Sequence, residues 1–258
     1  METSRIFERL KQLVVSESRA VLWLNGPDKH SPVWQSIWNT ASLRVCTDGA
    51  ANSLEPLVRS GEFCLPTLIT GDFDSINARS RAYFKSRGVH LQETPDQDYT
   101  DMCKALQLIA NEIQRKSHNV NDVIILGGLS GRFDHTLSSL HSLLKFASIS
   151  NCPAVLIDST NLIVIIDQGL TELHFEGDRS LMTSICGIIP FCQKKTIVTT
   201  DGFKWDIANA EMEFGKLVSS SNQIASDVVR IETNTPLLFT MQLTDEAIDT
   251  SNSSSSSV

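Results

Sequence analysis

The stretch that decides the fold of this chain is Thr67-Leu68-Ile69-Thr70-Gly71-Asp72-Phe73-Asp74. A short apolar run ends at a glycine, and two carboxylates follow at a spacing of two residues. This pattern is typical of the carboxyl end of a strand in an open α/β sheet, where such folds bind ligands. If the backbone stays extended, Asp72 and Asp74 point the same way and Phe73 points inward. The stretch is then either a site that needs a cation between the two charges or a solvated turn with an aspartate cap.

Short apolar runs alternate with helical segments over the first 150 residues. The helical spacing is clearest over residues 99–116, where apolar side chains recur every three to four positions. Strands that alternate with helices predict a parallel sheet with helices on both faces. The expected fold class is therefore α/β, with a three-layer α/β domain over residues 21–150. Its strands are predicted at Val21–Leu24, Leu43–Cys46, Thr67–Thr70, Val89–Glu93 and Asp122–Leu126.

The pattern changes near Asn151. Strands are predicted at residues 154–157 and 161–166, and short alternating segments follow up to residue 244. They indicate a smaller all-β sandwich domain over residues 151–246. Residues 1–20 are expected to form an N-terminal helical extension, and the serine-rich residues 247–258 a disordered tail.

Composition limits the class of protein. A net charge of -8 argues against a nucleic-acid partner or an acidic membrane surface. The six cysteines include no C-x-x-C pair, which is typical of reduced thiols in a cytoplasmic protein. The longest apolar run, Leu162–Ile166, is too short to cross a bilayer.

Acidic or glycine-rich signals follow four of the predicted strands. Because the carboxyl ends of parallel strands share one edge, these signals are expected to converge in space. A single aspartate at a helix start is usually a cap, but a whole edge of aspartates would repel itself without cations. An all-oxygen ligand set favours Mg²⁺, which normally comes with substrate phosphates. The four signals are Asp48-Gly49, Asp72-x-Asp74, Asp96-x-Asp98-x-x-Asp101 and Gly127-Gly128-x-x-Gly131-Arg132-x-Asp134.

The glycine-rich turn is the candidate phosphate site. It follows a buried strand and opens a helix, whose N-terminal amides favour anions. Arg132 supplies a planar fork for phosphate oxygens. The spacing matches neither the P-loop nor the dinucleotide fingerprint, so a tight structural turn is the alternative.

Several nearby residues have two interpretations each. Asp98 and Asp101 are either site residues or plain helix caps. Lys104, one turn further on, either pairs with Asp101 or reaches a phosphate. His135 is either a site residue or a packing histidine.

The ordered motifs of the chain resemble thiamine pyrophosphokinase, from about residue 20 to 244. The first domain carries Thr47-Asp48-Gly49-Ala50, Gly71-Asp72-Phe73-Asp74-Ser75, Asp96-Gln97-Asp98-x-Thr100-Asp101 and Gly127-Gly128-x-x-Gly131-Arg132-Phe133-Asp134-His135. The second carries Thr200-x-Gly202-x-Lys204-Trp205 and Phe214-Gly215-x-x-Val218-Ser219-x-Ser221-Asn222. Phe203 and Ser220 are small departures from the family pattern.

The resemblance implies transfer of the diphosphate of ATP to the hydroxyl of thiamine, giving thiamine diphosphate and AMP. It also implies a homodimer with active sites between subunits. Asp48, Asp72, Asp74 and Asp101 are then expected to hold Mg²⁺, and Asp72, Asp74, Asp101 and Arg132 to be the catalytic residues. The implied nucleotide-binding set is Gln97, Asp98, Thr100, Lys104, Gly128, Gly131, Arg132, Asp134 and His135. The implied thiamine-binding set is Asp48, Trp205, Ser219, Ser221 and Asn222.

Two other functions remain open. An Asp-x-Asp after a strand also marks Mg²⁺-dependent phosphohydrolases that use an aspartyl nucleophile. The second alternative is a non-catalytic protein that senses a nucleotide or thiamine. The identity of a general base, the number of ions and the nucleotide preference are not assigned.

Overall fold

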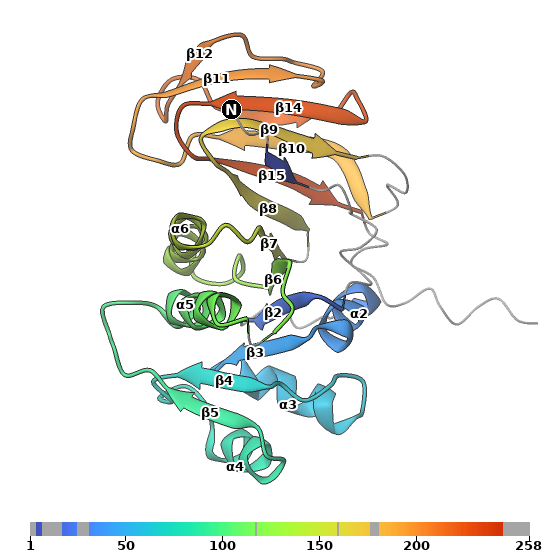
Figure 1. Ribbon diagram of the computed structural model, residues 1–258, viewed down its shortest axis with the longest axis vertical. Coiled ribbons are helices and arrows are strands. Elements are labelled where there is room, and N and C mark those ends of the chain that lie inside the picture. The colour runs from blue at the N-terminus through green and yellow to red at the C-terminus, as the bar shows by residue number, and fades with distance from the viewer. Residues whose placement is uncertain are drawn as a thin grey trace, which may run out of the picture. The chain divides into compact units, whose positions relative to one another are not determined.

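The structure, a computed structural model, describes residues 4–6, 17–24, 31–116, 118–158, 160–175 and 181–244. The chain divides into two compact units (Figure 1), one built from residues 15–159 and the other from residues 160–249 together with 1–14. The first is an α/β unit with a parallel sheet and the second is antiparallel in the main, which confirms the expected fold class. The serine-rich tail and most of the N-terminal extension lie outside the described residues.

The α/β unit is organised around a parallel sheet. Within its described part the strands pair in the order β7-β6-β2-β3-β4-β5. The central strands are buried on both faces, as the continuous apolar runs of β2 and β6 require. The strands are β2 (Arg19–Trp23), β3 (Leu43–Thr47), β4 (Leu68–Gly71), β5 (His90–Glu93), β6 (Asp122–Leu126) and β7 (Ala154–Ile157).

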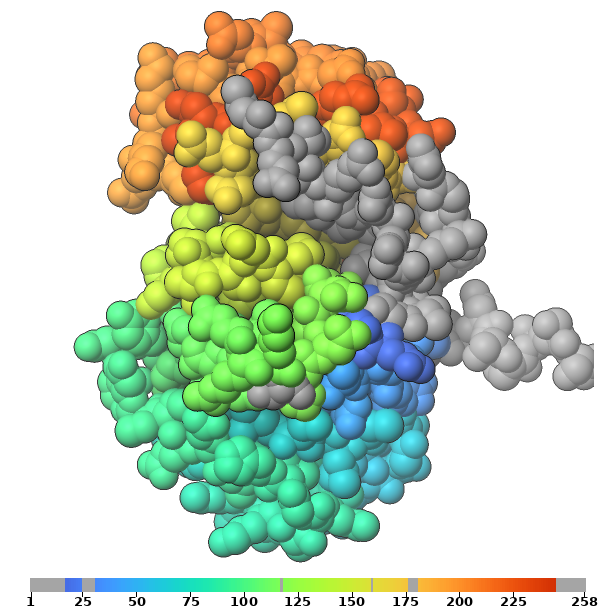
Figure 2. Space-filling model, viewed as in Figure 1, coloured from blue at the N-terminus to red at the C-terminus, as the bar shows by residue number. Residues whose placement is uncertain are grey.

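Helices cover both faces of this sheet (Figure 1). They are α2 (Pro32–Thr40), α3 (Ala51–Arg59), α4 (Ala78–Ser86), α5 (Asp101–Gln114) and α6 (Phe133–Ile149). Right-handed crossovers place α2, α3 and α4 on one face and α5 and α6 on the other. In the space-filling view (Figure 2), α5 and α6 form neighbouring parts of the visible surface, and they pack against each other. The winding reverses between β2 and β6, which is where open α/β sheets form a ligand crevice.

Local chemistry explains where the helices begin. The Ser31 hydroxyl accepts a hydrogen bond from the Trp34 amide, and Pro32 occupies the first helical position of α2. Asn77 and Thr100 cap α4 and α5 in the same way. None of the helices within the described ranges has both the length and the apolar character needed to cross a membrane.

An aromatic cluster fills the core beneath α2. The Trp23 ring meets Trp34 and Trp38 edge-on at 5.6 Å between ring centroids, and Phe63 at 5.3 Å. All four side chains are buried. Edge-to-face pairs of this kind add about 0.5–1.5 kcal/mol each to the gain from burial.

The β unit consists of two sheets. One has the order β1 (Ser4–Ile6), β9 (Gly169–His174), β14 (Val228–Thr233), β11 (Thr196–Asp201), β12 (Ala210–Met212). The strands β13 (Ser219–Gln223), β10 (Met182–Ile189), β15 (Leu237–Leu243) and β8 (Asn161–Ile166) pair in that order in the other. Burial alternates along β14, where Val229 and Ile231 are buried while Arg230 and Glu232 are exposed. This period of two is why the sequence pattern predicted strands here.

Two predictions about the ends of the units need correction. Residues Ser4–Ile6 lie inside the segment expected to be helical, yet they form β1 and pair in parallel with β9. The strand β7 was assigned to the second domain, but it pairs in parallel with β6 and therefore belongs to the α/β unit. In both cases a partner strand that is not adjacent in the sequence decides the assignment: β1 pairs with the remote β9, and β7 pairs with β6 although only a short turn separates it from β8.

Candidate functional site

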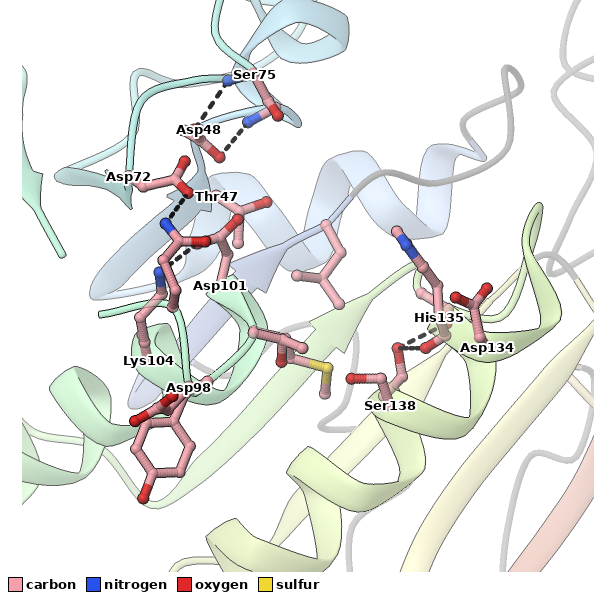
Figure 3. A pocket seen from close by; sticks show the side chains of 18 of the residues that line it. Thr47, Asp48, Asp72, Ser75, Asp98, Asp101, Lys104, Asp134, His135 and Ser138 are labelled. Carbon is pink, nitrogen blue, oxygen red and sulfur yellow. Dashed lines mark hydrogen bonds and ion pairs between the residues drawn. The ribbon is translucent and has the colours of Figure 1, made fainter. Parts of the chain in front are cut away.

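A cavity of about 540 Å³ opens at the carboxyl edge of the parallel sheet (Figure 3). Its walls come from segments that follow β2, β3, β4, β5 and β6, so the predicted convergence of the strand ends is confirmed. The lining residues are Leu24, Thr47, Asp48, Gly49, Asp72, Ser75, Gln97, Asp98, Tyr99, Thr100, Asp101, Met102, Lys104, Gly128, Ser130, Asp134, His135, Ser138 and Ser139.

Three carboxylates meet on one side of this cavity. Asp48, Asp72 and Asp101 each offer an oxygen, and these oxygens lie within 4.8 Å of one another. Asp48 follows β3, Asp72 follows β4, and Asp101 is the first residue of α5. We call these three residues the carboxylate cluster.

Asp48 is the buried member of the cluster, at 1% exposure. Its carboxylate accepts hydrogen bonds from the amides of Gly49 at 2.7 Å and Ser75 at 3.4 Å. Burial raises the pKa of the Asp48 carboxyl, and the nearby charges of Asp101 and Asp72 raise it further, while the two amides act in the opposite direction. The folded protein therefore holds a carboxylate that gains from a nearby cation.

Gly71 allows Asp48 to occupy this position. A Cβ atom at residue 71 would lie 2.5 Å from Cγ and 2.7 Å from Oδ1 of Asp48. These distances are shorter than any ordinary contact between carbon or oxygen atoms, so a side chain at this position would displace the carboxylate. The glycine that ends the deciding stretch is thus part of the site.

Asp72 is more exposed than Asp48, and a neutral partner holds it. The Gln97 side-chain amide donates a hydrogen bond to Oδ2 of Asp72 at 2.8 Å. This bond, followed by the one from the Asp74 amide, lowers the pKa of the Asp72 carboxyl. Gln97 was predicted to contact the nucleotide, and the structure places it beside the carboxylate cluster.

Asp74 is not a member of the carboxylate cluster, although it lies beside Asp72, to whose Oδ1 its amide donates at 3.2 Å. The backbone does not stay extended after Asp72, because Phe73 adopts a positive φ of 64°. Asp74 is exposed, and its carboxylate accepts a hydrogen bond from the Ser75 hydroxyl at 2.6 Å. Phe73 is half-buried beneath the Arg81 guanidinium, 4.9 Å from its ring centroid, so the inward Phe73 expected from an extended strand is not found.

Lys104 pairs with Asp101, as one of its two interpretations predicted, and its contact with a phosphate stays a prediction. Its ammonium lies 2.9 Å from Oδ1 of Asp101 and donates to the carbonyls of Thr94 at 2.8 Å and Asp96 at 3.1 Å. An ammonium has three donors, and these three acceptors match them. Lys104 therefore ties Asp101 to the segment that carries Gln97 and Asp98.

The glycine-rich turn forms another wall of the cavity. Gly127, Gly128 and Gly131 adopt φ values of +90°, +96° and +84°, which side chains strongly disfavour. Gly128 lines the cavity together with Ser130. A Cβ atom at Gly128 would meet a methyl group of Leu24 at 2.9 Å.

Arg132 points to the surface in this structure. Its side chain is 72% exposed, and Nε donates to Oδ1 of Asp134 at 3.1 Å. The pairing raises the pKa of the arginine and lowers that of the aspartate. Asp134 and His135 line the cavity, whereas Arg132 and Gly131 are not among its lining residues.

Thr100 combines a structural and a site position. Its hydroxyl caps α5 by accepting from the Cys103 amide, and it lies 3.3 Å from the Ser142 hydroxyl of α6. Thr100 also lines the cavity, as does Asp98. Further lining residues were not predicted from the sequence, notably Leu24, Thr47, Ser130, Ser138 and Ser139. Their signal was position: Leu24 directly follows β2 and Thr47 ends β3, while the three serines lie in the glycine-rich turn or in the first two turns of α6.

The β unit gathers a second group of predicted residues. Asn222 is buried, accepts a hydrogen bond from the Trp205 amide at 3.3 Å, and donates to the Trp205 carbonyl at 2.9 Å and the Ser219 hydroxyl at 3.2 Å. The Trp205 ring is 54% exposed and carries the Lys204 ammonium 4.5 Å from its centroid. Ser221 is exposed at a positive φ of 60°. The structure thus brings Trp205, Ser219 and Asn222 together.

Fold and site define a two-unit α/β and all-β protein with an acidic cavity beside a glycine-rich turn. The family description "Thiamin pyrophosphokinase, catalytic domain" matches residues 34–156, and "Thiamin pyrophosphokinase, vitamin B1 binding domain" matches residues 171–238. The chain belongs to the thiamin pyrophosphokinase family.

Relatives and solved structures agree with this assignment. The chain is 40% identical over 223 residues to thiamin pyrophosphokinase 1 of Caenorhabditis elegans, which covers 86% of this chain and 88% of the relative. It is 31% identical to thiamine pyrophosphokinase 1 of rice, over 80% of this chain and 81% of the relative. The crystal structure of yeast thiamin pyrophosphokinase superposes with a TM-score of 0.80 at 25% identity and covers 97% of this chain and 95% of that chain.

Proposed function

We propose that this protein transfers the diphosphate of ATP to the hydroxyl of thiamine and releases thiamine diphosphate and AMP. The observation that carries the proposal is the carboxylate cluster beside the glycine-rich turn, in a chain of the thiamin pyrophosphokinase family. A phosphoryl-transfer site needs charge neutralisation and alignment more than covalent chemistry. The carboxylate cluster would supply charge neutralisation by holding a cation, and the glycine-rich turn would align the phosphates.

The donor set of the cluster fits Mg²⁺. Three carboxylates that converge within 4.8 Å supply hard oxygen ligands, and burial raises the pKa of Asp48, so a cation would stabilise its charged form. Asp48, Asp72 and Asp101 would hold the ion, and Asp74 remains a predicted fourth ligand. When bound, the ion would neutralise charge on the phosphates.

The remaining cavity residues would hold and align the nucleotide. Gln97 orients Asp72, and Lys104 fixes Asp101 while its charge offsets part of the cluster. The glycine-rich turn would face the phosphates with its backbone, together with Asp98, Thr100, Asp134 and His135. Arg132, now paired with Asp134, would move to the phosphate chain.

Thiamine would bind to residues of the β unit and to Asp48. Trp205 presents an exposed aromatic face suited to a cationic ring, and Asn222 fixes the loop that carries it. Ser219 and Ser221 would supply hydroxyl contacts. The thiamine hydroxyl oxygen would attack the β-phosphorus in line as AMP leaves with the bridging oxygen.

We further propose a cytoplasmic homodimer whose active sites lie between subunits. Phe214, Leu217 and Ile185 are large apolar side chains exposed on the β unit, and association of two subunits would cover such side chains. All six cysteines are free, which fits a reducing compartment. The acidic net charge supports the absence of a nucleic-acid or acidic-membrane partner.

A product assay tests the function. The purified chain is incubated with ATP, Mg²⁺ and thiamine, and AMP, ADP and phosphate are resolved. Equal amounts of AMP and thiamine diphosphate are expected. Phosphate released without thiamine would indicate a phosphohydrolase instead, and thiamine binding without turnover would indicate a sensor.

A further inference from the structure

The glycine-rich turn is held in shape by hydrogen bonds to the end of β7, to Asp158 and to α6. The Gly127 amide donates to the carbonyl of Ile157 at 2.8 Å, and the Leu129 amide donates to Oδ2 of Asp158 at 2.8 Å. On the other side, the Ser139 hydroxyl donates to the carbonyl of Gly128 at 2.8 Å. The turn is therefore held by hydrogen bonds to the end of β7 on one side and to the second turn of α6 on the other.

Asp158 is the charged member of this group of contacts. It directly follows β7, it is 3% exposed, and it is not among the residues that line the cavity. A buried carboxylate is costly unless hydrogen bonds compensate it, and an amide that donates to a carboxylate makes a stronger bond than one that donates to a neutral acceptor. The bond to Leu129 is thus a strong constraint on a segment that its glycines leave flexible.

We propose that Asp158 is a positioning residue for nucleotide binding. By holding the Leu129 amide, the carboxylate fixes the backbone between Gly128 and Ser130, the two turn residues that line the cavity. The ligand class is the phosphate chain of a nucleotide, and this assignment rests on the proposed function. Asp158 does not line the cavity, so it would act through the turn.

The experiment compares Asp158→Ala and Asp158→Asn with a control at Asp122. Asp122 is also a partly buried aspartate, but it lies at the opposite end of β6 and pairs with Arg19. Asp122→Asn lowers stability without touching the turn, so it reports a merely structural effect. For each variant we would measure Tm, the KM values for ATP and thiamine, and amide exchange of the peptide that covers residues 127–132.

Asp158→Ala is expected to raise the KM for ATP about tenfold, because losing a charge-assisted hydrogen bond has about this effect. The KM for thiamine should stay unchanged and amide exchange at the turn should accelerate. Asp158→Asn keeps an acceptor oxygen and should restore most of the ATP affinity. Asp122→Asn should lower Tm with no change in either KM.

A KM for ATP in Asp158→Ala that matches that of Asp122→Asn would overturn the proposal. If the wild-type chain makes no thiamine diphosphate, the proposed function fails separately. Calorimetric binding of Mg²⁺-ATP then replaces KM: weaker binding by Asp158→Ala still supports positioning by Asp158, and equal binding refutes it.

Discussion

Replacing Gly71 by alanine should inactivate the protein while leaving it folded. The added Cβ atom would lie 2.5 Å from Cγ, 2.7 Å from Oδ1 and 2.8 Å from Cβ of Asp48. The aspartate must therefore retreat by about 1 Å to restore normal contacts. It cannot do so without lengthening its hydrogen bonds to the Gly49 and Ser75 amides.

Two magnitudes follow from this geometry. Overpacking of this kind costs about 1–3 kcal/mol of stability. A displacement of about 1 Å in a group that aligns the reaction lowers turnover by about 100-fold. The assay is thiamine diphosphate formation over a range of Mg²⁺ concentrations, with Tm measured on the same samples.

Gly61→Ala is the matched control. Gly61 also has a positive φ, +85°, but no heavy atom lies within 4 Å of the point that a Cβ atom would occupy there. Alanine at this position therefore adds backbone strain of about 1–3 kcal/mol without contact with the site. Both variants should lose stability, and only Gly71→Ala should lose turnover. Similar turnover in the two variants would refute the role assigned to Gly71.

Three further predictions concern single side chains. Asp74→Asn should abolish AMP production with an unchanged Tm, because it removes the predicted fourth metal ligand without changing the side-chain volume. Unaltered turnover would mean that the carboxylate cluster holds the ion without Asp74. Asp48→Asn should raise the Tm of the metal-free protein at neutral pH. Burial raises the pKa of Asp48 above 3.8, so this carboxyl destabilises the fold increasingly as the pH rises from below 3.8 through the raised pKa. Calorimetry at several pH values should therefore show that the higher Tm of Asp48→Asn disappears in acid. Trp205→Ala should raise the KM for thiamine about tenfold and leave that for ATP unchanged, since an exposed ring contributes to ligand contact rather than to stability.

Local patterns were enough to predict most of the α/β unit. Apolar periodicity is a short-range signal, so a helix was predicted over residues 99–116, and α5 is found there at Asp101–Gln114. The strand Ser4–Ile6 could not be predicted in this way. It exists because it pairs with β9, which is remote in the sequence, and its own charged neighbours favour a helix.

For the candidate site, too, only the features that follow from short-range patterns and sheet topology could be predicted. The convergence of Asp48, Asp72 and Asp101 followed from the rule that parallel strands end at one edge. The position of Asp74 outside the carboxylate cluster could not be predicted in this way, because it depends on the positive φ of Phe73. The role of Lys104 was predicted in part. Its spacing from Asp101 indicated an ion pair, but its hydrogen bonds to the carbonyls of Thr94 and Asp96 depend on how the loop folds.

The tryptophans described above make the protein its own optical probe. Trp23, Trp34 and Trp38 are buried in one cluster of the α/β unit, and the fourth, Trp205, stands exposed on the β unit. A water-soluble quencher will therefore reach the emission of Trp205 first and leave the shorter-wavelength light of the cluster untouched. Unfolding of one unit before the other will appear as two spectrally separate steps, without any label.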